Sequence, residues 1–211
     1  MDKTYGEYCG LARSLDRIGD RWTLLIVREL LVGPARYRDL QDGLPGVATN
    51  LLAQRLRQLG QDGIVRRRLD EHGGGVVYEL TSLGADLEET VLALVRWGKT
   101  WMEPGPGNDA FRPRWLVIAL RALLPEAPIS PETHVEVWCS DEPVTVSRDA
   151  KGLSVAIGAT EKPQAKLTGN PAEVLGLATG FMTLDQARAA GARLDGSSAA
   201  LRRALFAGTS A

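Results

Sequence analysis

The residue types best suited to chemistry lie along one face of a predicted helix over residues 49–62. Three leucines fall on the opposite face at the 3.6-residue helical period, so the helix is amphipathic. The polar face carries Asn50, Gln54, Arg57 and Gln61. Amide and guanidinium groups can hydrogen-bond to base edges and phosphates in the major groove of DNA. The pattern therefore predicts a helix that packs its leucines inward and presents a nucleic-acid-binding face.

Arginines gather around this helix, although the chain as a whole is close to neutral. Its formal net charge is −1 at pH 7, so composition alone does not indicate a nucleic-acid partner. Between residues 36 and 68, seven arginines and three aspartates leave a local charge of +4. The arginines are Arg36, Arg38, Arg55, Arg57, Arg66, Arg67 and Arg68. Such a cluster is often only a solvated surface, but the polar helix within it favours DNA phosphate as the partner.

The segments around the polar helix follow a familiar order. Apolar residues at helical spacing predict two earlier helices, over 11–18 and 23–31, and Asp20 is placed to N-cap the second. A short polar segment precedes the polar helix. Two strands, 64–69 and 76–80, follow it and are joined by a glycine-rich tip. This order is typical of a winged helix-turn-helix, whose helix enters the major groove while the hairpin, or wing, reaches the flanking backbone.

Not every arginine in the cluster is expected to contact DNA. Alternation along the first wing strand sends Arg66 and Arg68 to one face and Arg67 to the other. Arg55 lies only about 60° from the leucine face, given 3.6 residues per turn. A salt bridge that braces the domain is at least as good an interpretation of Arg55 as a phosphate contact.

A wide apolar stripe marks a further predicted helix over residues 82–102. It comprises Leu83, Leu87, Val91, Leu92, Leu94, Val95, Gly98 and Trp101. This stripe is wider than one small domain needs. The helix either packs only on its own core or also contacts a second subunit.

The first hundred residues contain a series of ordered blocks, at residues 8–9, 15–30, 37–40, 44–47, 49–56, 62–65 and 77–81. Together they resemble the HxlR-type bacterial regulators, a MarR-related branch of the winged-helix proteins. The resemblance implies a homodimer that binds double-stranded operator DNA, with the terminal helices of the winged domain forming the dimer contact. Ala48 replaces the serine often found before the recognition helix, which leaves the N-cap to Thr49 or to nothing.

Position by position, the resemblance and the spacing together predict the DNA-binding face. Its candidate residues are Arg36, Arg38, Thr49, Asn50, Gln54, Arg57, Arg66, Arg68 and His72. Each contact with a phosphate would steepen the salt dependence of binding by about 0.9 in log–log slope.

The two cysteines, Cys9 and Cys139, lie far apart and have no metal-ligand spacing. A disulfide scaffold or zinc site is therefore not expected, which fits a reducing cytoplasm. Some HxlR-like regulators sense oxidants or electrophiles through a cysteine near position 9. The sequence favours a buried, small apolar residue at Cys9, and thiol-based redox sensing is the alternative.

The second half of the chain has a different organisation. A Pro/Gly-rich linker over 103–112 separates a winged domain, 1–102, from a second domain, 113–211. A helix over 115–124 is followed by period-two strands, which predict an antiparallel meander. The further elements are a strand over 165–168, helices beginning after Asn170 and after Thr183, and a last helix over 197–206. The predicted class is α+β, with an antiparallel sheet covered by helices.

Over about residues 113–207, this half resembles the sterol carrier protein 2-like fold, on residues 165–184, 190–196 and 201–206. The resemblance implies an apolar tunnel for lipids or other hydrophobic molecules, and hence effector sensing. Candidate lining residues are Trp115, Leu116, Ala119, Val137, Val155, Leu175 and Phe181. For each of them, the sequence by itself favours ordinary core packing.

Catalysis has little support in the sequence. His72 and His134 stand apart from any Ser/His/Asp grouping, and neither a phosphate-binding loop nor an HExxH motif occurs. No cofactor, metal, membrane span or secretory signal is expected. The sequence predicts a dimeric DNA-binding regulator that responds to a small hydrophobic ligand. The alternatives are a hydrophobic-ligand carrier whose winged helix mediates protein contacts, and an enzyme that uses the C-terminal cavity.

Overall fold

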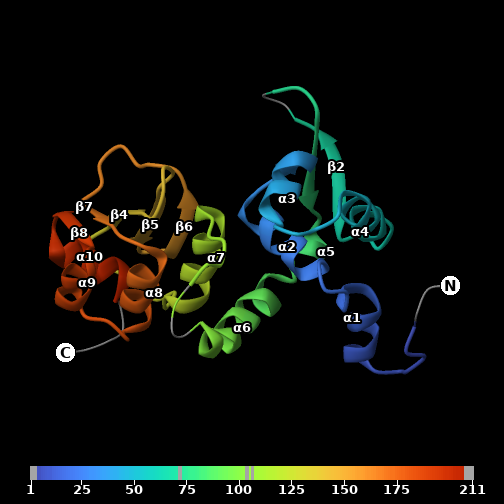
Figure 1. Cartoon of the computed structure of the whole chain (residues 1–211), viewed down its shortest axis with the longest axis horizontal. Coiled ribbons are helices and arrows are strands. Elements are labelled where there is room, and N and C mark those ends of the chain that lie inside the picture. The colour runs from blue at the N-terminus through green and yellow to red at the C-terminus, as the bar shows by residue number, and fades with distance from the viewer. Residues whose placement is uncertain (1–3, 71–72, 103–104, 106, 207–211) are drawn as a thin grey trace. The chain divides into compact units, whose positions relative to one another are not determined.

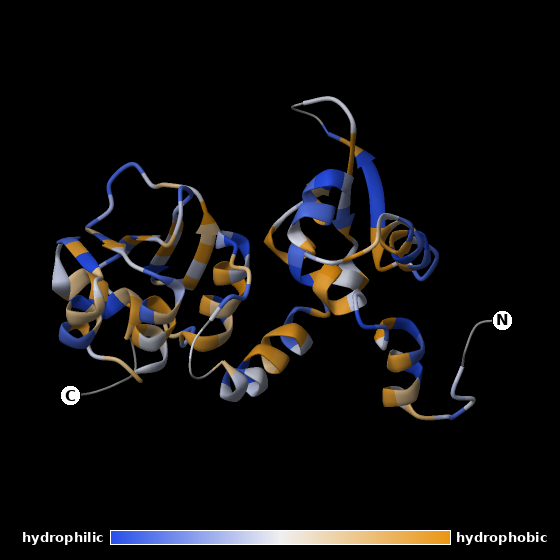
Figure 2. Ribbon diagram, in the orientation of Figure 1, coloured by the Kyte–Doolittle hydropathy of each residue, from blue (hydrophilic) through white to orange (hydrophobic). Residues whose placement is uncertain are grey.

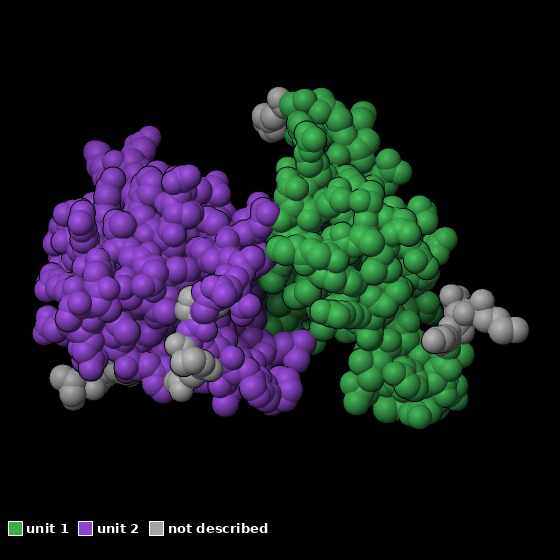
Figure 3. Space-filling model, in the orientation of Figure 1, with its two compact units in different colours: residues 1–91 green, residues 92–211 purple. Residues whose placement is uncertain are grey.

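The computed structural model describes residues 4–70, 73–102, 105 and 107–206 (Figure 1). The chain divides into two compact units, Met1–Val91 and Leu92–Ala211 (Figure 3). Each unit has a sheet of its own. The predicted linker over 103–112 includes residues 103, 104 and 106, which are outside the described residues, and the predicted domain boundaries stay a prediction.

In the described part of the N-terminal unit, helices pack around a small three-stranded sheet. The elements are α1 (Gly10–Ile18), α2 (Thr23–Val32), β1 (Ala35–Arg36), α3 (Tyr37–Gly43), α4 (Thr49–Gln61), β2 (Val65–Leu69), β3 (Val76–Leu80) and α5 (Ser82–Ala85). The predicted winged helix-turn-helix is confirmed: α3 and α4 form the helix-turn-helix, and β2 and β3 form the wing. The sheet order is β1-β3-β2, and both pairs are antiparallel.

The leucine face of α4 anchors this unit. Leu52, Leu56 and Leu59 are at most 4% exposed, and hydrophilic residues colour the outer side of the same helix (Figure 2). Burial of one such side chain stabilises a fold by about 1.5–3 kcal/mol. Because the three leucines share one face, their burial sets the rotation of α4 about its own axis.

The predicted helix over 82–102 is wrong as a single element. The structure divides it into α5, α6 (Glu88–Gly98) and a 3-10 turn, Lys99–Trp101. The Thr81 hydroxyl accepts a hydrogen bond from Gly84 N and donates one to Gly63 O at 2.6 Å. A Cβ at Gly84 would lie 2.1 Å from Ile64 O. This close approach anchors α5 to the start of the wing, and a separate helix follows.

The described C-terminal unit is a five-stranded sheet with helices, so the predicted α+β class is confirmed. Its further elements are α7 (Pro113–Leu123), β4 (Thr133–Trp138), β5 (Val144–Asp149), β6 (Gly152–Ile157), β7 (Ala165–Thr168), α8 (Pro171–Thr179), α9 (Leu184–Ala190), β8 (Arg193–Gly196) and α10 (Ser198–Leu205). The strand order is β6-β5-β4-β7-β8. α7 and α10 pack against the sheet, and α8 and α9 lie beside them (Figure 1).

One strand pair departs from the predicted antiparallel sheet. The meander β4-β5-β6 is antiparallel as expected, but β7 pairs with β4 in parallel. Residues 158–164 connect β6 to β7, and Thr160 N donates to Glu136 Oε1 at 3.1 Å on the way. Gln164 N then bonds to His134 O. This segment begins β7 beside β4 in the same direction as β4, which makes the sheet mixed.

Helix starts in this unit follow the local sequence. Asn170 and Glu173 form the predicted capping box at α8, and Thr183 and Gln186 form the one at α9. Among the described residues, none of the helices combines the length and the apolar composition that a membrane span requires.

Replacing Leu56 by alanine should lower the free energy of unfolding of the N-terminal unit by about 2–5 kcal/mol, because it leaves a cavity beneath α4. Leu69, which is 74% exposed, provides the matched control, and Leu69→Ala should change stability by less than about 0.5 kcal/mol. Urea unfolding followed by circular dichroism measures both. Equal effects would contradict the burial of the α4 leucines.

Candidate nucleic-acid interface

The outward face of α4 carries the predicted DNA-binding residues. Thr49, Asn50, Gln54 and Arg57 are all exposed, whereas the leucines on the opposite face are buried. A helix with this arrangement can approach a DNA groove without losing its packing on the domain.

The preceding helix fixes the start of α4. From α3, the Tyr37 hydroxyl donates to Thr49 O at 2.6 Å, and Gln41 Nε2 donates to Thr49 Oγ1 at 2.7 Å. The N-cap residue is Ala48, and α4 has no side-chain cap hydrogen bond. The sequence left two alternatives, a cap from Thr49 or no cap, and the structure shows the second. Tyr37 and Gln41 thus help to position α4, and the sequence pattern did not single them out.

Arg55 braces the domain. Its guanidinium forms an ion pair with Asp20, and both side chains are partly shielded from solvent. Asp20 Oδ1 also accepts a hydrogen bond from Trp22 N at 3.3 Å. The sequence predicted that Asp20 is the N-cap of α2. This prediction is wrong, because Trp22 occupies the N-cap position and makes no side-chain cap hydrogen bond. The salt-bridge interpretation of Arg55 fits this geometry.

The wing carries its arginines on two faces, as alternation predicts. Arg66 and Arg68 both bind Glu79, through Nε–O distances of 2.7 and 2.6 Å. The hydrogen bond from Arg68, supported by the one from Arg66, lowers the pKa of Glu79. On the other face, Arg67 lies over the ring of Tyr78, 5.7 Å from its centroid. The sequence pattern gives no signal for Glu79, because its pairing with the two arginines depends on the strand register.

The remaining predicted contacts lie near the wing or outside the described residues. Arg36 belongs to β1, and its Nη2 binds Asp70 Oδ2 at 3.0 Å. Arg38 is exposed on α3. His72 lies outside the described residues.

Comparison with known proteins places this half of the chain in a family. The model of HxlR-like helix-turn-helix proteins matches residues 17–106. The transcriptional regulator sll1512 of Synechocystis is 35% identical over 99 residues, which are 46% of this chain and 73% of that protein. The regulator YodB of Bacillus subtilis is 35% identical over 89 residues, 42% of this chain and 80% of YodB. The chain belongs to the HxlR family.

Members of the HxlR family are DNA-binding transcriptional regulators, and the relatives that match this chain are regulators, not enzymes. A solved structure of the redox regulator HypR in its oxidised form is 31% identical, covers 44% of this chain and 96% of HypR, and has a TM-score of 0.41. The family model ends at residue 106, and the sheet of the C-terminal unit lies beyond the matched residues.

In this HxlR-family chain, Cys9 is exposed, so the favoured prediction of a buried Cys9 is wrong for the single chain. Cys9 occupies the N-cap position of α1, and only Ala12 is buried along that helix. A helix that packs so little of its surface leaves its first turn open to solvent. Cys139 is half-buried, and burial, together with the nearby Glu173 carboxylate, raises the pKa of its thiol to about 12.

The predicted ligand-lining residues of the C-terminal unit differ widely in their exposure to solvent. Leu116, Val137 and Val155 are buried in the core, whereas Phe181 is 71% exposed. Trp115, Ala119 and Leu175 are half-buried. A hollow of about 720 Å³ lies elsewhere in this unit, against Ile129, Gly180, Met182, Thr183, Leu184, Asp185, Arg202, Arg203 and Phe206. None of the seven predicted residues lines this hollow.

The two cysteines should differ in reactivity. At about pH 8, iodoacetamide should alkylate Cys9 quickly and Cys139 slowly, because Cys139 has almost no thiolate and is shielded. Peptide mass spectrometry over a time course measures each site. The Cys9→Ser variant is the control and should lose the fast reaction; rapid labelling of Cys139 in the folded protein would contradict this difference.

Proposed function

We propose that this chain binds operator DNA as a homodimer, through the outward face of α4 and one face of the wing. The contact residues are Arg36, Arg38, Thr49, Asn50, Gln54, Arg57, Arg66, Arg68 and His72. The observation that carries the proposal is the polar, exposed face of α4, which is held in place by three buried leucines and by Tyr37 and Gln41. Amides and arginine on such a face suit base edges and phosphates.

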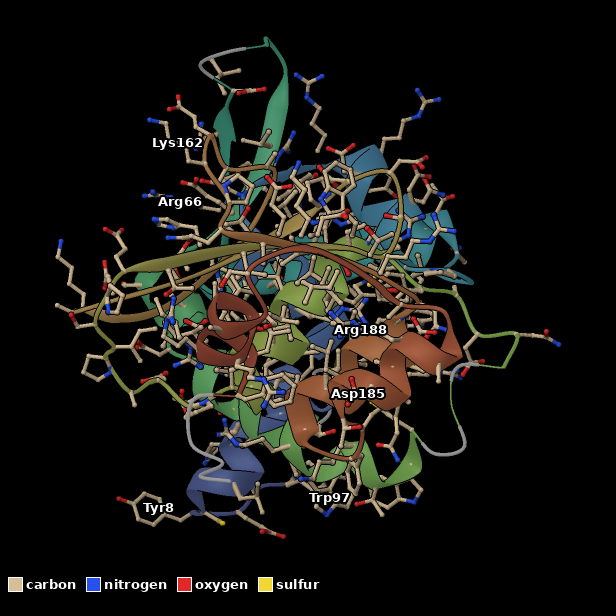
Figure 4. All side chains as sticks on the ribbon, turned by 90° about the vertical axis from the view of Figure 1, so that its left-hand side faces the viewer. Tyr8, Arg66, Trp97, Lys162, Asp185 and Arg188 are labelled. Atoms are coloured by element: carbon tan, nitrogen blue, oxygen red, sulfur yellow. The ribbon has the colours of Figure 1, made fainter. Side chains whose placement is uncertain are left out.

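Exposed apolar side chains support a second subunit. On α1, Leu11 is 68% exposed, and on the segment from α6 onward Trp97 and Trp101 are 68% and 65% exposed. The rings of Trp97 and Trp101 meet edge to face, with centroids 4.5 Å apart. Tyr8 and Trp97 both project from the surface in Figure 4. Exposed apolar groups of this size commonly mark protein interfaces, and a dimer would present two α4 helices to successive major grooves about 34–36 Å apart.

Arg57→Ala should weaken binding to a duplex from the region upstream of the protein's own gene by about tenfold or more, as expected for a lost contact of 1–3 kcal/mol. Fluorescence anisotropy with labelled duplex measures the affinity. Gln58→Ala is the control on the same helix, because Gln58 is half-buried and its amide donates to Asp62 at 3.3 Å. Arg188→Ala removes an equal charge from α9. Equal losses in Arg57→Ala and either control would contradict the assigned face.

We also propose that the C-terminal unit binds a small hydrophobic effector. The support is its resemblance to the sterol carrier protein 2-like fold, with Trp115, Leu116, Ala119, Val137, Val155, Leu175 and Phe181 as the lining. The effector would change the separation of the two α4 helices. A ligand can do so only if it binds the two arrangements with different affinity.

Native mass spectrometry of protein purified from its host should detect a dimer that retains a small molecule. Removing that molecule should change the affinity for operator DNA, and adding it back should restore the original value. Operator titrations with the emptied and the refilled protein measure the effect. Unchanged affinity at saturating ligand would reject the effector mechanism, and a monomer bound to operator would reject the dimer.

A second candidate function is thiol-based sensing through Cys9. The observation that favours it is the exposure of Cys9, which gives an oxidant or electrophile direct access. It predicts that alkylation of Cys9 alters operator binding, and an alkylated protein with unchanged affinity would exclude it.

A further inference from the structure

Glu79 lies between two of the proposed DNA-binding arginines on one face of the wing. In the β2–β3 register, Arg66 is directly opposite Glu79 and Arg68 is opposite Val77. Residues that face each other across an antiparallel pair share a face, and diagonal neighbours remain within reach of long side chains. The strand register therefore brings one carboxylate to two guanidinium groups.

Each of the two arginines contacts this carboxylate through its Nε atom, and each bonds to a different oxygen. Arg66 Nε donates to Oε1 of Glu79 at 2.7 Å, and Arg68 Nε donates to Oε2 at 2.6 Å. The side chain of Glu79 is 14% exposed, whereas that of Arg66 is 67% exposed. The carboxylate is therefore more buried than the arginines and is hydrogen-bonded to the Nε atom of each. Figure 4 shows Arg66 projecting from the wing.

A second ion pair repeats this arrangement on the same face. Arg36 lies opposite Val77 on the other side of β3, and its guanidinium binds Asp70 at 3.0 Å. On this face, Arg36, Arg66 and Arg68 share two carboxylates. Among the described residues of this face, three guanidinium groups and two carboxylates therefore leave one net positive charge for an approaching phosphate.

We propose that Glu79 determines the specificity of DNA binding, by holding Arg66 and Arg68 in one geometry and by cancelling part of their charge. The inference rests on the proposed interface, in which these arginines contact DNA. Non-specific binding depends almost entirely on phosphate neutralisation, so a carboxylate among the wing cations weakens it directly. The operator complex also has the contacts of α4 with bases, which Glu79 does not touch.

Glu79→Gln removes the charge and keeps an oxygen that can accept from Nε, and Glu79→Asp keeps the charge. The matched control is Glu142→Gln, which removes the same charge from an exposed position in the C-terminal unit. Affinities for a duplex from the upstream region and for a duplex of scrambled sequence are measured at several salt concentrations. Circular dichroism establishes that each variant is folded.

One additional phosphate contact steepens the log–log salt slope by about 0.9, which corresponds to about eightfold tighter binding at 0.1 M salt. Glu79→Gln should show this change with the scrambled duplex and a smaller gain with the upstream duplex, so that the ratio of the two affinities falls. Glu79→Asp and Glu142→Gln should keep the wild-type slope. A role limited to stabilising the hairpin would change the unfolding temperature and leave the salt slope unchanged.

The wing arginines separate failure of this inference from failure of the proposed interface. If Arg66→Ala flattens the salt slope but Glu79→Gln changes neither slope nor affinity ratio, the inference about Glu79 is wrong and the interface stands. If Arg66→Ala and Arg68→Ala both leave the slope unchanged, the proposed wing contact is wrong, and the inference falls with it. A steeper slope in both Glu79→Gln and Glu79→Asp would also contradict a role for its charge.

Discussion

The burial of three leucines on α4 determines what the N-terminal unit can present to a partner. Leu52, Leu56 and Leu59 occupy one stripe of the helix and are excluded from water. When one face of a helix is buried in the core, the rotation of the helix about its axis is fixed, so the opposite face must point outward. The hydrogen bonds from α3 to Thr49 then fix the position of the helix along its axis. The amides and the guanidinium of the outward stripe are thereby oriented before any DNA arrives.

Electrostatics around this helix are more balanced than the arginine count suggests. Arg55 is paired with Asp20, Arg36 with Asp70, and Arg66 and Arg68 with Glu79. Exposed ion pairs of this kind contribute little to stability. The three pairs that involve Arg36, Arg66 and Arg68 instead act on one face of the wing sheet, where they limit both the mobility and the net charge of these arginines.

Elements that depend on local pattern could be predicted from the sequence. The period of the leucines gave α4 its two faces, and the spacing of Asn170 and Glu173 marked the start of α8. Elements that depend on distant partners could not. The strand β1 has only two residues, which are too few to show the alternation that predicts a strand. The parallel pairing of β7 with β4 depends on the path of residues 158–164. The role of Glu79 could not be predicted for the same reason, since only the register of the hairpin places it between two arginines.

Ala48 gives the recognition helix an open beginning. A serine at this position could hydrogen-bond to an amide of the first turn and complete the helix from within the protein. With a methyl group there, the positive end of the helix dipole has no partner from its own N-cap side chain. A phosphate seated at this end would act as the missing cap and would stabilise the first turn of α4.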